Sequence, residues 1–121
     1  MNIRAILLTL IFVSFNNLAD ENICQKSKLI SEQEGAIINS FKSGYKVIGN
    51  GRAHFYYSPN VNCKEKNLFL IKDDLVNASI VYDDFTSIMY LNKNGQVIDG
   101  WIKSNRLTPT GTGIGPSDEN R

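Results

Sequence analysis

Histidine is almost missing from this chain of 121 residues, in which His54 is the only one. Serine and cysteine nucleophiles usually need a histidine base, and tight zinc sites draw mainly on histidine and cysteine. His54 lies between Ala53 and Phe55 in an expected strand, so its side chain points to the face opposite both. A lone strand histidine is typical of a surface or an interface. We therefore expect a protein that is not an enzyme and that has no metal or cofactor.

Carboxylates occur as two adjacent pairs, Asp73-Asp74 and Asp83-Asp84, but without the spacing of a catalytic or calcium site. Adjacent residues in a turn rarely converge on one substrate, and a calcium loop needs alternating oxygen ligands and a glycine. Aspartate is common in turns because its side chain bonds to nearby backbone groups. We therefore interpret both pairs as turns.

The chain also lacks an apolar run long enough to cross a bilayer, which takes about 20 residues. Its N-terminal run is about half that length, follows a basic start at Arg4 and precedes a polar stretch that ends at Ala19. That layout is typical of a cleaved secretory signal peptide. We predict a signal peptide over residues 1–19, and a mature chain that starts near Asp20 and resides in the periplasm.

Excess charge of either sign is absent from the predicted mature chain. The full sequence has 13 basic and 12 acidic residues, and one basic residue, Arg4, leaves with the signal peptide. Binding to nucleic acid or to an anionic membrane surface depends on clustered positive charge. The neutral balance therefore argues against both kinds of partner.

Cysteine is scarce, but the two that occur, Cys24 and Cys63, both lie in the mature part. An even number of cysteines in an exported chain indicates a disulfide. Neither cysteine has a neighbour that suggests a reactive or metal-binding thiol. We predict a Cys24–Cys63 disulfide, which would stabilise the fold by roughly 4 kcal/mol through the chain-entropy effect.

The first part of the mature chain, residues 20–44, differs in texture from the rest. Ser31 and Glu34 have the spacing of a capping box, and the apolar residues that follow are compatible with one helix face. Gly44 is a suitable stop. The pattern predicts a short helix over residues 32–42, in a segment tethered by the disulfide.

From Tyr45 onwards the signals change to short strands and turns. We expect strands at residues 45–48, 52–57, 68–71, 75–82, 85–91 and 96–103. Asn94-Gly95 is the strongest hairpin signal, because both residues tolerate the positive φ of a type I′ turn. Such closely spaced strands predict a mainly β domain, a small barrel of five to seven strands over residues 45–107. The tail, residues 108–121, has no apolar anchors and is predicted to be mobile.

Four segments of this β region resemble the bacterial SH3-like domain family. They are RAHFYYSPN at 52–60, FLIKDDLV at 69–76, FTSIMY at 85–90 and GWIKSNRL at 100–107. The closing Gly100-Trp101-Ile102 is the most specific of them. Asp73 stands where the family usually has glycine, and Phe85 stands where tryptophan is common. With these departures, the chain resembles a divergent branch of the family found in small exported proteins of Gram-negative bacteria. The resemblance implies an SH3-like barrel, and some proteins of this type inhibit enzymes that attack the cell wall.

Aromatic residues are the positive signal for binding. Neighbours in a strand point to opposite faces, and a barrel this small cannot bury both faces, so some aromatic side chains should be exposed. Exposed Tyr and Trp commonly anchor protein interfaces and ligand grooves. The candidate binding residues are Tyr56, Tyr57, Tyr82, Phe85, Tyr90 and Trp101. The resemblance implies a groove between the loops at 58–66 and 82–85, lined by Tyr56, Tyr57 and Trp101.

Two functional hypotheses follow. The first is a periplasmic inhibitor, most concretely an immunity protein that binds an enzyme toxin directed at peptidoglycan. The alternative is a module that binds peptidoglycan or a peptide, as SH3-like domains commonly do. Such modules are usually attached to a catalytic domain, and this sequence contains no sign of one, which favours the inhibitor.

Overall fold

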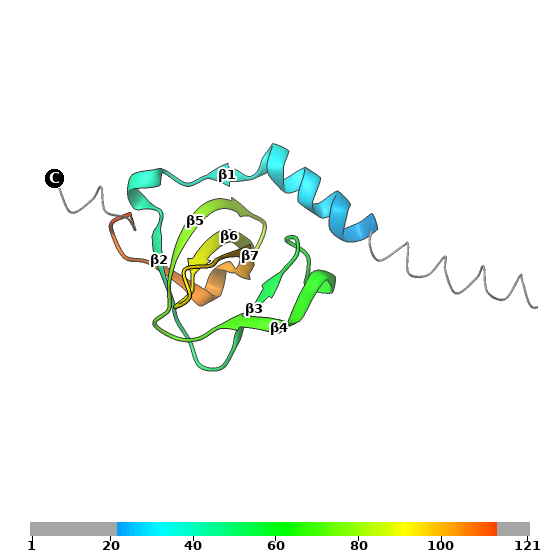
Figure 1. The fold of residues 1–121 in the computed structure, drawn as a ribbon. Coiled ribbons are helices and arrows are strands. Elements are labelled where there is room, and N and C mark those ends of the chain that lie inside the picture. The colour runs from blue at the N-terminus through cyan, green and yellow to red at the C-terminus, as the bar shows by residue number, and fades with distance from the viewer. Residues whose placement is uncertain (1–21, 114–121) are drawn as a thin grey trace, which may run out of the picture.

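The computed structural model describes residues 22–113, so the predicted signal peptide lies outside the described residues. Eight antiparallel strands dominate the fold, which is mainly β as predicted (Figure 1). The strands are β1 (Ala36–Ile37), β2 (Gly44–Val47), β3 (Ala53–Tyr56), β4 (Lys64–Leu70), β5 (Leu75–Tyr82), β6 (Phe85–Leu91), β7 (Val97–Lys103) and β8 (Leu107–Pro109). Single 3-10 turns cover Ser40–Lys42, Val61–Cys63 and Ser104–Arg106. No helix in this part of the chain is long and apolar enough to cross a membrane.

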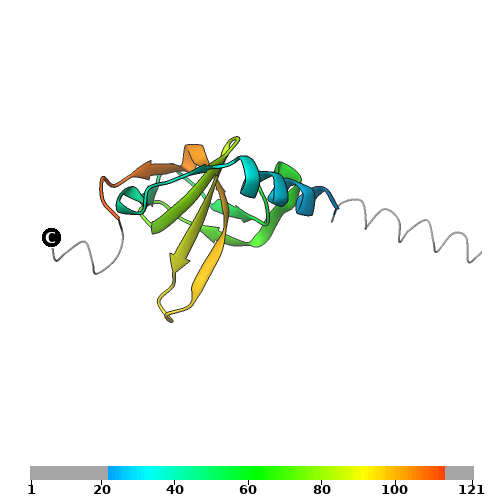
Figure 2. The ribbon, with the colours of Figure 1, turned by 90° about the horizontal axis from the view of Figure 1, so that it is seen from above.

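The strands form one sheet in the order β4-β3-β7-β6-β5-β2-β8, with β1 added on β5. The sheet curls into a half-barrel around a core, as the two views of the ribbon show (Figures 1 and 2). The hairpin of β6 and β7 is the longest regular pairing, and its far end projects beyond the rest of the sheet (Figure 2). The main core lies on the inner face and contains Val47, Phe55, Val76, Ile88 and Ile102 among its buried residues.

The sequence predicted the strands of this sheet well. β5 and β6 have the bounds that the sequence predicted, and the other four expected strands differ by a few residues at their ends. One detail of the β6–β7 turn was wrong, because only Gly95 has a positive φ there, at 79°, and Asn94 does not. The Asn92 side chain accepts hydrogen bonds from the backbone N–H groups of Asn94 and Gln96. The loop therefore closes around Asn92, and it is not a type I′ turn.

The N-terminal helix was predicted in the wrong place. It spans residues 22–34 and ends where the prediction had it begin. Ser31 lies in its last turn, fully buried, and its hydroxyl donates to the carbonyl of Lys28 instead of capping a helix start. The residues expected to follow in the helix instead form β1, in which Ala36 pairs with Val81 on β5.

Three attachments hold this helix against the sheet. The predicted disulfide is present, with Cys24 and Cys63 bonded and their Cα atoms 5.8 Å apart. The hydroxyl of Ser27 donates to the carbonyl of Pro59 at 3.2 Å. After the helix, Gly35 lies so close to Ile80 that a Cβ atom built on it would overlap the Ile80 side chain. A glycine is needed here because any side chain would push the helix away from the sheet.

The C-terminal segment is ordered further than predicted. β8 extends to Pro109 and pairs with β2, and Thr110 donates its backbone N–H to the carbonyl of Gly44. Gly44 in turn donates to the carbonyl of Thr112. The predicted mobile tail therefore does not begin at Thr108, because β2 has an edge free to pair with it. Residues 114–121 lie outside the described part.

A single arginine holds the turn between β2 and β3. The Arg106 guanidinium donates four hydrogen bonds to backbone carbonyls, with donor–acceptor distances between 2.7 and 3.4 Å. The acceptors are the carbonyls of Ile48, Gly49, Gly51 and Arg52. Gly49 and Gly51 both have positive φ, and both lie in the turn between the end of β2 and the start of β3. Arg106 thus closes a turn that lies more than fifty residues away in the sequence.

Replacing Arg106 with alanine is expected to lower the free energy of unfolding by about 2–3 kcal/mol. Each bond from a charged donor contributes roughly 1.5–3 kcal/mol where it is shielded, and less where the carbonyl also reaches water. Arg106→Lys should recover less than half of the loss, because an ammonium lacks the planar fork. Urea unfolding measures both variants against Lys93→Ala in the exposed β6–β7 loop. An unchanged midpoint in Arg106→Ala would show that the guanidinium does not hold the turn.

Candidate functional site

The candidate binding site is a hollow of about 480 Å³ on the outer face of the sheet, beside the N-terminal helix. Three of the predicted binding residues, Tyr56, Tyr57 and Trp101, line it together. The other lining residues are Lys28, Glu65, Ser79, Ser87, Ile88, Met89, Asp99 and Gly100. The loop at 58–66 contributes only through Glu65, and no residue of the turn at 82–85 lines the hollow. The groove implied between these two loops is therefore displaced towards the β6–β7 hairpin.

Strand pairing brings the three aromatic residues together. Tyr56 lies opposite Trp101 in the one registered pair between β3 and β7. Tyr57 follows β3 directly, and its backbone N–H donates to the carbonyl of Cys63 at 2.9 Å. The disulfided loop thus fixes the backbone of Tyr57. Gly100, beside Trp101, leaves room for the Phe55 ring, because a Cβ atom there would come within 2.8 Å of it.

Four of the six predicted binding residues form a second, smaller core on the outer face. Tyr56, Phe85 and Trp101 are buried, and Tyr82 packs against them. The rings of Tyr56 and Phe85 meet edge to face with centroids 4.9 Å apart, a favourable aromatic geometry. Tyr56 and Trp101 remain only 6% and 5% exposed. Both residues reach the hollow, but most of their surface serves packing.

The two remaining predicted residues lie in different surroundings. Tyr90 is half-buried and packs against the main core on the inner face, away from the others. Tyr57 is 62% exposed and is the most accessible of the six. The structure therefore brings Tyr57 into the hollow with an open ring, and Tyr57 is a better probe of binding than Tyr56.

Sequence reasoning missed three apolar residues on the β6–β7 hairpin. Met89, Leu91 and Val97 are 50%, 66% and 63% exposed. Leu91 pairs directly with Val97, and Met89 lies two residues from Leu91 on the same face. Met89 also lines the hollow beside Tyr57. The sequence did contain a signal for this apolar face, because Ile88 to Leu91 is apolar at every position. Alternate residues of a strand point to opposite faces, so some of these side chains had to lie outside the core.

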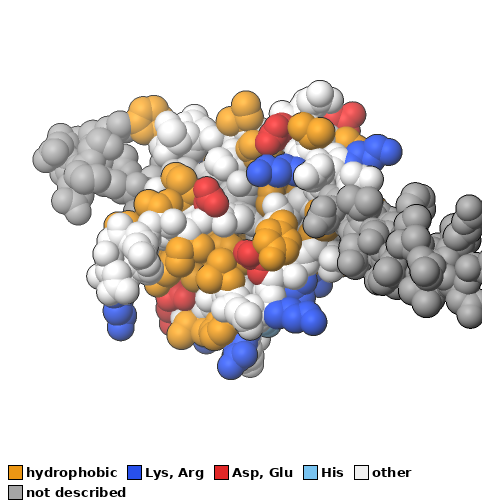
Figure 3. Space-filling view, turned by 45° about the vertical axis from the view of Figure 1, so that its right-hand side comes forward, with side chains coloured by type: hydrophobic (Ala, Val, Ile, Leu, Met, Phe, Trp, Pro, Cys, Tyr) orange, Lys and Arg blue, Asp and Glu red, His pale blue; other side chains and the backbone are white. Residues whose placement is uncertain are grey.

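These residues define an apolar outer face, which we call the hairpin face: Tyr57, Met89, Leu91 and Val97. The part of this face near Phe85 and Trp101 is not accessible, because both side chains are buried and Lys28 of the helix borders the hollow. At the far end of the hairpin, Leu91 and Val97 are exposed. The space-filling view shows apolar side chains gathered between separated acidic and basic groups (Figure 3).

Charge around the hollow is mixed, with Lys28 on one side and Glu65 and Asp99 among the lining. Within the described chain, none of these three groups forms an ion pair; the one pair found joins Lys46 and Asp73 at 3.9 Å. No three His, Cys, Asp or Glu side chains in that part converge as metal ligands. The hollow thus offers aromatic and apolar contact with unpaired charges at its border, which suits the binding of a polypeptide.

Comparison with known proteins identifies no relative. No family model matches this chain, and neither a curated protein nor a solved structure matches it.

Proposed function

We propose that this protein is an exported inhibitor that binds another protein through the hairpin face and the hollow beside it. The observation that carries the proposal is the exposure of Tyr57, Met89, Leu91 and Val97 on one continuous surface. Contiguous apolar surface of this kind on a small protein commonly marks an interaction site. Tyrosine and methionine are both enriched in the centres of protein interfaces.

The rigidity of the scaffold supports the same function. The backbone N–H of Tyr57 donates a hydrogen bond to the carbonyl of Cys63, which is itself disulfide-bonded to Cys24 in the helix. The hairpin strands are paired along their whole length from Phe85 to Leu91. A binding surface that is already ordered loses little conformational entropy when the partner docks. An inhibitor gains affinity from such preorganisation.

The more specific proposal concerns the partner. The resemblance to SH3-like domains of small exported proteins supports a target in the bacterial envelope. An immunity protein that neutralises a peptidoglycan-directed enzyme combines export, a single small domain and a surface suited to protein contact. We include the SH3-like barrel in this proposal, because the curled, antiparallel half-barrel is compatible with that fold.

Clearing of a peptidoglycan suspension provides the test. Muramidases, amidases and endopeptidases, including any wall enzyme encoded next to this gene, are assayed with and without the disulfide-bonded protein. We expect the protein to slow one class of enzyme stoichiometrically. Tyr57→Ala and Met89→Ala should weaken inhibition, and truncation of a central anchor costs about 2 kcal/mol, roughly thirtyfold in affinity.

Ile71→Ala is the matched control, because Ile71 is 54% exposed but lies on the β4–β5 turn, outside the hairpin face. It should inhibit like the unaltered protein. A sedimentation assay with bare peptidoglycan separates the alternative. Protein that slows no enzyme but pellets with peptidoglycan would contradict the inhibitor and support a wall-binding module.

A further inference from the structure

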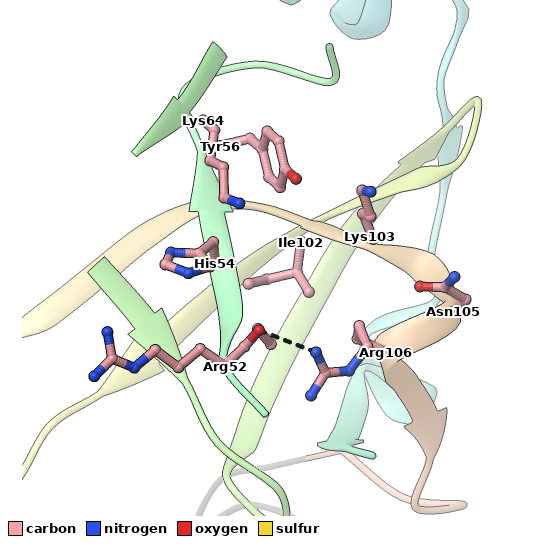
Figure 4. Close-up of a pocket in the computed structure, with 9 residues that line it drawn as sticks. Arg52, His54, Tyr56, Lys64, Ile102, Lys103, Asn105 and Arg106 are labelled. Atoms are coloured by element: carbon pink, nitrogen blue, oxygen red, sulfur yellow. Dashed lines mark hydrogen bonds between the residues drawn. The ribbon is translucent and has the colours of Figure 1, made fainter. Parts of the chain in front are cut away.

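A second hollow, of about 290 Å³, opens where β3 and β7 separate. The two strands share only the Tyr56–Trp101 pair. Beyond that pair, β3 stays hydrogen-bonded to β4, whereas β7 leads into the 3-10 turn at Ser104–Arg106. The charged and polar lining residues of the hollow are Arg52, His54, Tyr56, Lys64, Lys103, Asn105 and Arg106. Figure 4 shows Tyr56, Lys64, Lys103 and Arg106 around the gap, whereas the guanidinium of Arg52 points away from it.

Charge in this second hollow has one sign. Two lysines and two arginines line it, and no carboxylate of the described chain is among its lining residues. The mature protein as a whole is predicted to be neutral, so this concentration is local. Lys64 and Lys103 form no ion pair in the part of the chain that the structure describes. Both side chains are exposed, one from β4 and one from the end of β7.

The four cations do not play the same part. The Arg106 guanidinium donates its hydrogen bonds to carbonyls of the β2–β3 turn, one of which belongs to Arg52 (Figure 4). The Arg52 guanidinium lies over the Phe69 ring, 4.4 Å from its centroid. The donors of Arg106 are thus occupied by backbone carbonyls, and the Arg52 guanidinium is turned towards Phe69, so both arginines contribute mainly a positive field. Lys64 and Lys103 remain as exposed donors that can bind a ligand.

His54 adds an independent observation. This residue is among those that line the same hollow, and its Nδ1 atom is buried without a hydrogen-bond partner in the described chain. Buried polar atoms are nearly always paired, because an unpaired one costs free energy. The ring is tilted against Phe69 with centroids 5.9 Å apart.

We infer that this hollow binds an oxyanion, a phosphate or carboxylate group held between Lys64 and Lys103 with His54 at its wall. Lysine ammonium groups pair with such oxygens through charge-assisted hydrogen bonds. The surrounding arginines raise the local positive potential, which concentrates anions. The site is separate from the hairpin face, and the inference does not depend on the proposed function.

Titration with inorganic phosphate, and separately with acetate, tests the site in the disulfide-bonded protein by two-dimensional amide NMR at constant ionic strength. We expect saturable shifts confined to residues of β3, β4 and the end of β7. Lys64→Gln and Lys103→Gln should each weaken binding about two- to fivefold, and the double variant should abolish saturation. The anion that binds more tightly identifies the class of the natural group.

Lys93→Gln, which removes one charge from the distant β6–β7 loop, is the matched control and should bind like the unaltered protein. The amide spectra themselves show that each variant is folded. Shifts that grow linearly for both anions, or that spread over all surface lysines, would overturn the inference. So would an unchanged affinity in the Lys64→Gln, Lys103→Gln double variant.

Discussion

Removal of the disulfide should lower the free energy of unfolding by about 4 kcal/mol, since the bond closes a loop with a sequence separation of 39 residues. The bond restrains the unfolded chain, and in the folded state it fixes the first turn of the helix to the loop after β3. The Cys24→Ala, Cys63→Ala double variant is preferable to serine, because Cys63 is only 2% exposed and a serine would bury a hydroxyl there.

Urea unfolding of this double variant, followed by far-ultraviolet circular dichroism, measures the effect. The unaltered protein in reductant is the control and should unfold at nearly the same urea concentration as the double variant. We also expect the helix signal to be lost before the sheet, because of the three attachments described above only the Ser27 hydrogen bond and the close packing of Gly35 then remain. An unfolding midpoint that does not respond to reductant would contradict a stabilising disulfide.

Replacing Trp101 with alanine should cost about 3–5 kcal/mol, the range for truncation of a large buried aromatic side chain. Trp101 is 5% exposed, and it packs with Tyr56 and Phe85 in the outer core. Its loss would leave a cavity in the outer core and remove the partner of Tyr56 on β7. Trp101→Phe should recover much of the stability by filling part of that space.

Tyr57→Ala is the comparison, since it removes a neighbouring but exposed aromatic ring and should change stability by less than about 0.5 kcal/mol. Circular dichroism is the appropriate probe, because Trp101 is the only tryptophan and its fluorescence vanishes with it. If the two variants were equally stable, the outer aromatic cluster would not be a core.

The strands could be predicted because their signals are local. β5 and β6 are rich in apolar and β-branched residues, and Asp83, with a φ of 54°, makes the turn between them. Asp73-Asp74 precedes β5, and the Asn92–Gly95 loop follows β6. The position of the helix could not be predicted, because the face that it turns to the sheet consists of Cys24, Ser27 and Ser31. Those residues have helical spacing but are small or polar, so the apolar periodicity that reveals most helices is missing.

The candidate site was predictable in part for a related reason. Strand alternation correctly separated Phe55 from Tyr56, which lie in the inner and outer cores. Strand alternation could not show that the outer face is buried near Phe85 and Trp101 but exposed at the end of the β6–β7 hairpin. The helix that borders the buried part was expected elsewhere in the chain. Tyr56 was therefore expected to be more open than it is, and Met89, Leu91 and Val97 were overlooked.

The position of β2 has a consequence for the rate and order of folding. β2 pairs with β5, but it also pairs with β8, and its Val47 lies opposite Leu107. The β2–β3 turn likewise acquires its guanidinium clamp from Arg106. Contacts between such distant segments slow folding, because loop closure must precede any gain from them. β2 comes early in the chain, but its pairing is thus complete only after β8 has joined it.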